Sequence, residues 1–302
     1  MVDQHFYRDE ELSKFIKLQT NKRFYCICCG NKKFSNWTSL FNAKFNTQKC
    51  SVCGFIFMNP FTSDRGLSFY YNNYIDKRRL SNKKKMLLRE KQYELDAQFI
   101  KKYVKSGKLL DIGCSGGFFL KKLPKSFEKY GIDLDVEAIN YANKNSKFKA
   151  NLIGGDFLKQ KYKNNYFDVI TMRGTIEHLS NPEKYLKKIT RILKPGGKLF
   201  IIATPNGSSI GAKIFKKHWT LYHPIQHLSH FSMNNLELFL KRYNLNQYTY
   251  EYPYLGTPYE NFFKDLLNHL YCLIKLTISN DKNIMNTPPF FGNMISACFT
   301  KD

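Results

Sequence analysis

The stretch KLLDIGCSGGFFL, residues 108–120, constrains the fold more than any other part of the sequence. An apolar run with one carboxylate, Asp111, leads into a turn that contains Gly113, Ser115 and Gly117, and an apolar helical pattern comes next. This order predicts a strand, a tight turn and a helix, because glycine permits positive φ and lets the backbone approach a ligand closely. The expected helix would offer free N–H groups and its positive dipole end to a carboxylate or phosphate.

Strands and helices are expected to alternate after this turn. Five β-strands are predicted, at residues 108–112, 129–132, 150–153, 167–172 and 198–204. The segments between them have helical periodicity, which is typical of a parallel, doubly wound α/β sheet with ligands at the carboxyl ends of its strands. We therefore expect Asp111, Asp133 and Asp156 to meet at one edge of the sheet, together with the segment after Met172.

The order of elements changes after the fifth strand. Residues 205–231 are predicted as a long loop rich in histidine and aromatic residues, and Ser232 as the N-cap of the next helix. Residues 293–300 are predicted as an antiparallel last strand. Between them lies a helical insertion, 255–288, whose apolar helical face we interpret as packed on the core, as a lid or dimer face, or as a contact with a membrane that carries a lipid-linked acceptor.

Two C-x-x-C pairs near the start of the chain predict a metal site. Each pair ends in glycine, which permits the turn that points two sulfurs at one tetrahedral ion. The expected ligands are Cys26, Cys29, Cys50 and Cys53, with Cys28 facing outward. A site closed by four cysteines leaves no open coordination position, so we expect structural and not catalytic zinc.

The charge of the chain limits its partners only weakly. Forty-eight Lys and Arg residues against 24 Asp and Glu give a net charge of +24, which suits nucleic acid, an anionic membrane or an anionic substrate. The excess lysine is spread along the whole chain, however, as in proteins from AT-rich genomes. The N-terminal stretch has no apolar core of a signal peptide, and no run of 18 apolar residues occurs, so we expect a cytoplasmic protein without a membrane span.

The residues after the glycine turn indicate which ligand it holds. Asp133, at the end of the second strand, is placed to accept hydroxyls of a ribose, which suits NAD and S-adenosylmethionine equally. Over residues 106–206 the chain resembles the class I S-adenosylmethionine-dependent methyltransferases. Five motifs carry the resemblance, in order: LLDIGCSGGFFL, YGIDLD, GGDFL, YFDVITMRGTIEHLSNP and ILKPGGKLFIIATPN.

The resemblance implies a cofactor site that runs along the strand ends. Its expected residues, from the methionine part through the ribose and adenine to the sulfonium, are Asp111, Gly113, Ser115, Gly117, Asp133, Leu134, Asp156, Phe157, Met172 and Arg173. Ser115 replaces the second glycine that is common in the family, and Asp156 has the alternative role of capping the turn next to it.

The domain order refines the resemblance. We expect an N-terminal helix and zinc ribbon in residues 1–60, a linker and helix in 61–105, and the methyltransferase domain in 106–302. This order, with TPNGSS and HWTLYHPIQHLSHFS, resembles bacterial methyltransferases associated with surface polysaccharide, sugar or lipid-precursor biosynthesis. It implies O-methylation of a small-molecule or glycan-precursor acceptor. The alternatives are an RNA methyltransferase that uses the ribbon and the basic surface, and a non-enzymatic scaffold.

Methyl transfer to a hydroxyl needs an aligned acceptor and a group that removes its proton, and histidine suits the second task near neutral pH. We expect His178 to be this base or to orient the acceptor, with helix packing or cofactor contact as the alternative role of its EHL motif. His227 and His230 in the long loop are the competing candidates.

Overall fold

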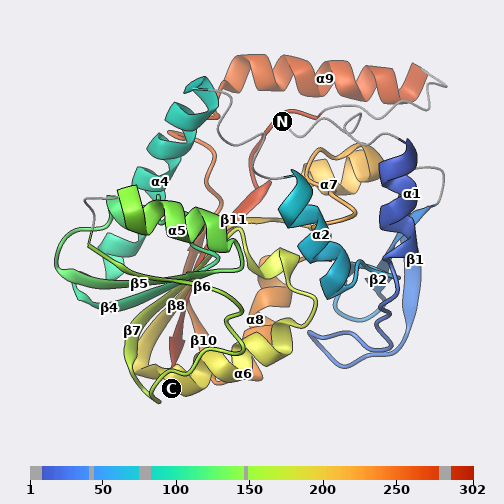
Figure 1. Cartoon of the computed structure of the whole chain (residues 1–302). Helices are drawn as coiled ribbons and strands as arrows, with labels where there is room; N and C mark the ends of the chain where they lie inside the picture. Colours follow the sequence, from blue (N-terminus) through green and yellow to red (C-terminus); the bar gives the residue numbers. More distant parts are fainter. Residues whose placement is uncertain (1–8, 41–43, 75–82, 146–148, 279–286) are drawn as a thin grey trace.

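The computed structural model describes residues 9–40, 44–74, 83–145, 149–278 and 287–302. Within these ranges the strands form one sheet of seven strands and one of four, which lie beside each other (Figure 1). The larger sheet contains the glycine turn, and the smaller one contains the cysteine pairs.

The seven-stranded sheet has the strand order β10-β11-β8-β7-β4-β5-β6. Its strands are β4 Gly107–Ile112, β5 Phe127–Asp133, β6 Asn151–Gly154, β7 Phe167–Arg173, β8 Leu193–Pro205, β10 Leu245–Glu251 and β11 Met294–Lys301. The strands from β8 to β6 are parallel, whereas β11 pairs antiparallel with both β8 and β10. The doubly wound α/β prediction with an antiparallel last strand is therefore confirmed.

Helices pack on both faces of this sheet because alternate residues of each buried strand point to opposite sides. On one face Leu110 and Ile112 pack with α6 (Pro182–Ile192) and α8 (Met233–Lys241). On the other face Leu109 packs with α4 (Lys83–Tyr103) and α5 (Val136–Asn145). Ser232 is the N-cap of α8, as predicted, and forms a capping box with Asn235.

The helix expected directly after the glycine turn is absent from this fully described part of the chain. Between β4 and β5 the backbone forms only the short 3₁₀ turn η2, Leu120–Lys122. Pro124 lies two residues beyond it, and a helix seldom continues into a proline. The prediction of a helix N-terminus at the turn is wrong, because the segment between the turn and Pro124 has room for only a short helix, and short helices are marginal.

The predicted helix between β6 and β7 is also absent, and residues 155–166 form an irregular connection. Lys188 of α6 extends under this connection and donates to the carbonyls of Phe157, Leu158 and Gln160. These hydrogen bonds satisfy backbone acceptors that a helix would otherwise satisfy internally. Burial lowers the pKa of Lys188 accordingly.

The four-stranded sheet joins the cysteine region to the long loop. Its antiparallel order is β1-β2-β3-β9, with β1 Phe34–Leu40, β2 Phe45–Cys50, β3 Ile56–Met58 and β9 Ser229–His230. The strand β9 belongs to the loop predicted at 205–231, which also contains the helix α7, Ile210–Phe215. Arg23 supports the junction by donating to the carbonyl oxygen of Leu228 and to Ser229 Oγ at 3.3 and 3.1 Å.

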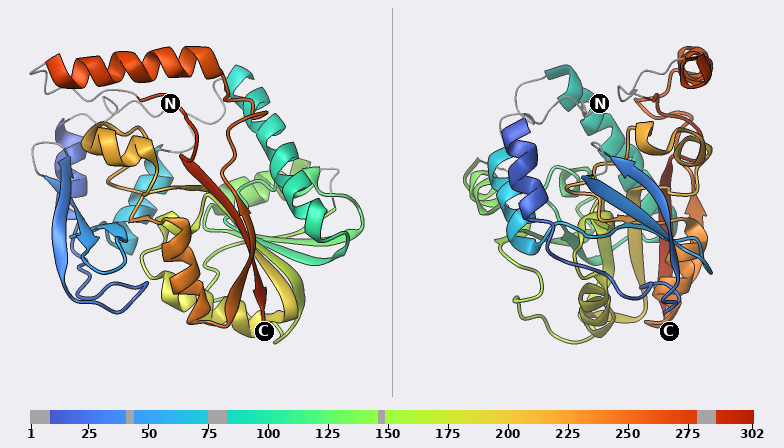
Figure 2. Two further views of the ribbon diagram at one scale, coloured as in Figure 1. Left: turned by 180° about the vertical axis from the view of Figure 1, so that it is seen from behind. Right: turned by 90° about the vertical axis from the view of Figure 1, so that its right-hand side faces the viewer.

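Three helices complete the described chain: α1 Asp9–Lys17, α2 Asp64–Tyr74 and α9 Phe262–Ile278. Helix α9 lies at the periphery of the molecule (Figure 2). The apolar side chains of the face predicted to pack on the core are exposed, Phe263 by 77% and Leu267 by 66%, so the core-packing interpretation of that face is wrong. On the other side of the helix Cys272 lies in a core cluster, with Leu273 and Leu276 packed against it. None of the described helices is both long and apolar enough to cross a bilayer.

The buried face of α9 contains two polar residues beside Cys272, and neighbouring segments supply partners for both of them. Asp265 accepts hydrogen bonds from Tyr254 Oη at 2.8 Å and from the Asn261 backbone at 3.1 Å. His269 contacts the rings of Phe215 and Phe290. A hydrophobicity pattern alone does not reveal such long-range partners.

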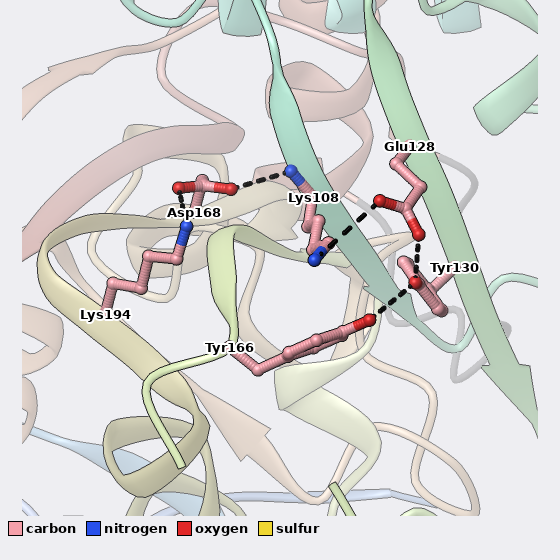
Figure 3. A network of polar contacts seen from close by, with 6 residues as sticks. All are labelled: Lys108, Glu128, Tyr130, Tyr166, Asp168 and Lys194. Carbon is pink, nitrogen blue, oxygen red and sulfur yellow. Dashed lines mark hydrogen bonds and ion pairs between the residues drawn. The ribbon is translucent and has the colours of Figure 1, made fainter. Parts of the chain in front are cut away.

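A polar network fixes the strand register at the amino end of the large sheet (Figure 3). Asp168 of β7 accepts from the Lys108 backbone of β4 at 2.8 Å and from Lys194 at 2.5 Å. The Tyr130 hydroxyl donates to Glu128 and lies 2.8 Å from the hydroxyl of Tyr166. This network lies at the opposite end of the strands from the glycine turn and has a structural role.

Candidate functional site

The glycine turn brings the ends of β4 and β7 into close contact. Gly113, Ser115 and Gly117 all have positive φ, at 84°, 47° and 70°. A Cβ atom on Gly113 would lie 2.6 Å from Thr175 Oγ1, so the position has room only for glycine. The turn therefore approaches the segment after β7 closely without being the N-terminus of a helix.

Asp133 holds this turn in place by hydrogen bonds, and its carboxylate can still accept hydrogen bonds from a ligand. Its Oδ2 accepts from the Ser115 backbone N–H at 2.7 Å, and its Oδ1 accepts from the Asp135 backbone at 2.9 Å. Each carboxylate oxygen can accept a further hydrogen bond, and the side chain is only half-buried. Leu134 beside it is 57% exposed and offers an apolar surface at the same edge.

The structure places the two residues expected at the adenine differently from each other. Asp156 is half-buried and accepts from the Leu158 backbone at 2.8 Å, so it does cap the turn next to it. Phe157 points into the core, where its ring lies 5.3 Å from that of Tyr185. Met172 is likewise fully buried. Phe157 and Met172 are thus packed in the core beneath the carboxyl ends of the strands.

Asp111 is buried beneath the turn and accepts from Thr171 Oγ1 at 2.6 Å. Burial raises the pKa of this carboxyl to about 7. Arg173 pairs with Asp96 of α4 at 2.5 Å, and its guanidinium lies 4.4 Å from the Tyr93 ring centre. Asp96 was missed by sequence reasoning, although a carboxylate next to the apolar positions of a basic helical pattern was a signal.

A cavity of about 390 Å³ opens next to Arg173. Its walls come from α4, the long loop and the segments before α9 and β11, and include Trp219, His223, Tyr254, Tyr259, Phe290 and Asn293. Among the described lining residues Arg173 is the one Lys or Arg, and its charge is balanced by Asp96. The cavity is therefore aromatic and close to electrically neutral.

The candidate histidines come together beside this cavity. The ring centre of His227 lies 4.8 Å from that of His178, 4.7 Å from that of His223 and 6.2 Å from that of His230. Burial lowers the pKa of His223 and His230 to about 3 and that of His227 well below its usual value. These three imidazoles are neutral at pH 7 and hold an added proton poorly, which makes each of them a weak general base.

The four predicted cysteines also meet. The Sγ atoms of Cys26 and Cys53 are 3.5 Å apart, those of Cys29 and Cys50 are 3.6 Å apart, and all four lie within 4.8 Å of one another. Zn–S bonds of about 2.3 Å in a tetrahedron separate sulfurs by about 3.8 Å, so this geometry fits a zinc ion.

The prediction that Cys28 faces outward is wrong, because Cys28 is 2% exposed. Both knuckles contact α8 and its C-cap: Arg242 donates to the Ile27 carbonyl in the knuckle that contains Cys28, and Asn235 donates to the Cys53 carbonyl of the other knuckle at 2.7 Å. Cys28 therefore behaves as a small apolar side chain in the contact between the two sheets.

Comparison with known proteins gives a consistent picture. A family model described as a methyltransferase domain matches residues 85–250. Phosphoethanolamine N-methyltransferase 3 of Arabidopsis thaliana is 35% identical over 31% of this chain and 20% of its own length. The ubiquinone biosynthesis O-methyltransferase of Hydrogenovibrio crunogenus is 29% identical over 35% of this chain and 47% of its own length. The chain thus spans half or less of these two curated relatives.

Among solved structures, a "possible histamine N-methyltransferase" from Thermotoga maritima superposes with a TM-score of 0.52 at 18% identity. The match covers 79% of this chain and 99% of that chain. At this identity the likeness establishes the fold of the large sheet.

Proposed function

The chain belongs to the methyltransferase-domain family, and we propose that it transfers a methyl group from S-adenosylmethionine to a hydroxyl of a sugar, a nucleotide-sugar or another polysaccharide or lipid-glycan precursor. The observation that carries the proposal is the position of the neutral aromatic cavity beside the strand-end edge. Arg173 ends β7 at that edge and also lines the cavity. A cofactor on the edge and an acceptor in the cavity would then meet at the end of β7.

The residues proposed to hold the cofactor lie at the carboxyl ends of the strands. They offer it either a carboxylate that can accept hydrogen bonds or an accessible backbone. Asp133 would accept ribose hydroxyls, the Gly113 turn would border the methionine part, and Asp156 would face the adenine. The buried Asp111 would lie beneath the methionine ammonium. When bound, S-adenosylmethionine supplies a methyl group that its sulfonium has already activated, so the protein's task is alignment of the acceptor and removal of a proton.

The lining of the cavity favours a hydroxylated small acceptor over RNA. A volume of about 390 Å³ is within the range of small-molecule sites. Aromatic side chains such as Tyr259 and Phe290, which keep exposed surface, suit the apolar faces of a sugar ring, and Thr220 and Asn293 can exchange hydrogen bonds with its hydroxyls. A polyanionic strand would instead call for unpaired Lys or Arg side chains.

We also propose structural zinc at Cys26, Cys29, Cys50 and Cys53, on the strength of their sulfur positions. The ion would hold the two knuckles together, and through β3 it would support β9 and the histidine-rich loop. We further propose that the protein is located in the cytoplasm.

The test uses the purified chain, methyl-labelled S-adenosylmethionine and an extract of the source cells separated into RNA, nucleotide-sugar and lipid-glycan fractions. We expect label in a sugar or glycan fraction, and none with Asp133→Asn as the matched control. Label in RNA would overturn the acceptor assignment and make the basic surface the recognition surface. Failure of the chain to bind S-adenosylmethionine would overturn the enzymatic proposal in favour of a scaffold.

A further inference from the structure

Three potential metal ligands lie together outside the cysteine site. Glu177 and His178 lie just after β7 in the turn η3, Ile176–His178, and His227 comes from the long loop. One ligand atom from each lies within 4.8 Å of the others. The backbone holds the two segments in place, since the Leu228 N–H donates to the Glu177 carbonyl at 2.8 Å.

Each of the three side chains is oriented by a polar contact of its other polar atom, the one that does not face the cluster. His178 Nδ1 lies 2.9 Å from the Gln226 carbonyl oxygen, and His227 Nδ1 lies 2.8 Å from that of Leu221. A ring nitrogen that faces a carbonyl carries the proton, so in each neutral ring Nε2 bears the lone pair. Glu177 Oε2 accepts from Thr204 Oγ1 at 3.1 Å, and its Oε1 lies 3.9 Å from His178 Nε2.

This pattern is the one that metal sites use. Histidine ligands commonly donate their second ring N–H to a carbonyl, and ligating carboxylates are themselves hydrogen-bonded, which fixes the ligand orientation. Glu177 is 2% exposed, and an ionised carboxylate buried to this extent is costly unless a cation compensates its charge. A divalent ion would compensate the charge and use the lone pairs of both rings.

We propose that Glu177, His178 and His227 form a second metal site, for a divalent transition-metal ion such as Zn²⁺, Fe²⁺, Mn²⁺ or Co²⁺. Two imidazoles and one carboxylate suit these ions and leave coordination positions for an exogenous ligand. The site is separate from the four cysteines, which would give a closed coordination sphere.

The role of the ion rests on the proposed methyl transfer. His223 lines the cavity and contacts His227, so the site borders the place of the acceptor. An acceptor hydroxyl bound to the ion would lose its proton to water more easily. Its oxygen would then form the new bond to the methyl carbon, while the electrons of the broken C–S bond remain on the sulfur of S-adenosylhomocysteine. His178 and His227 would be ligands in this scheme.

The test measures metal binding directly, with the full chain whose cysteine site is filled with one equivalent of Zn²⁺ and with no cofactor or acceptor present. Co²⁺ is the probe, because thiolate coordination gives an intense charge-transfer band and nitrogen–oxygen coordination gives only weak visible bands. We expect one further Co²⁺ per chain with the visible bands alone. Glu177→Gln, which keeps the bond from Thr204, is expected to weaken the Kd at least about 100-fold.

Two further variants make the result decisive. His178→Ala changes a ligand whose side chain is 19% exposed, so it tests the site even where Glu177→Gln fails to fold. Glu183→Gln removes a carboxylate from the neighbouring helix α6 that pairs with Arg242, and it should bind Co²⁺ like the unmodified chain. Absence of a second Co²⁺ in the unmodified chain, or an equal Kd in the ligand variants, overturns the site. Neither result depends on the proposed reaction, because no methyl transfer is measured.

Discussion

Replacing Asp111 by asparagine should make the chain more stable than the unmodified protein at neutral and alkaline pH. Asp111 is fully buried, and its main partner is the hydroxyl of Thr171, from which an asparagine amide oxygen can also accept. Burial raises the pKa of Asp111 from 3.8 to about 7 in the folded protein, whereas the unfolded chain has the ordinary value of about 3.9. Asparagine has no proton to lose and removes this difference.

The sign of the pH dependence of the unfolding free energy is set by the number of protons bound in the folded and in the unfolded state. Well below pH 4 the carboxyl is protonated in both states, so it adds no pH dependence there. As the pH rises to about 7, the unfolded chain releases the proton and the folded chain retains it, so the unmodified protein loses stability. A shift of about three pKa units corresponds to about 4 kcal/mol. The free energy of unfolding of Asp111→Asn minus that of the unmodified chain should therefore rise by up to about 4 kcal/mol between pH 4 and pH 8.

Urea unfolding at a series of pH values measures this difference, and titrations common to both proteins cancel. Asp168→Asn is the matched control on the neighbouring strand. Burial would raise the pKa of Asp168, but the hydrogen bonds from Lys194 and from the Lys108 backbone outweigh it and lower the pKa (Figure 3). Its stabilising effect is lost only as the pH falls below about 4, so the control difference should stay flat from pH 5 to pH 8. A flat difference for Asp111→Asn as well would refute the reasoning and mean that the buried carboxylate is ionised.

Three other outcomes are expected. Gly113→Ala should lower S-adenosylmethionine affinity at least about tenfold by calorimetry, because the residue has φ 84° and the new Cβ would lie 2.6 Å from Thr175 Oγ1; unchanged affinity would show that the turn is not at the cofactor. Removal of the proposed zinc by a chelator should speed amide hydrogen exchange at β9, since Ile56 pairs there with His230; unchanged exchange would mean that the ribbon does not support the loop. The double variant Phe263→Ser and Leu267→Ser should change the free energy of unfolding by less than about 1 kcal/mol in urea, because both side chains are exposed, and a larger loss would indicate that they are buried in a dimer.

The sequence predicted those features that depend on local pattern. Strand positions and the Ser232 cap are set by short-range chemistry, the clustering of the four cysteines follows from the two C-x-x-C pairs, and the antiparallel last strand is set by strand order along the chain. The two missing helices were overpredicted because their segments contain apolar residues with helical spacing. Pro124 in one segment and the long-range hydrogen bonds of Lys188 in the other decided against a helix, and only the first was visible locally.

The candidate site was less predictable because its second half depends on contacts between distant segments. His178 and His227 were each identifiable as candidate bases, yet their shared position with Glu177 arises only after the loop pairs with the ribbon through β9. The same packing buries His227 and lowers its pKa, which weakens it as a proton acceptor. A histidine in solution suits proton removal near pH 7, whereas a buried neutral imidazole held by a carbonyl suits coordination of a cation. If the histidines have the proposed role of metal ligands, the ribbon bears on the chemistry of the cavity, because its pairing with β9 places the loop that contains His227.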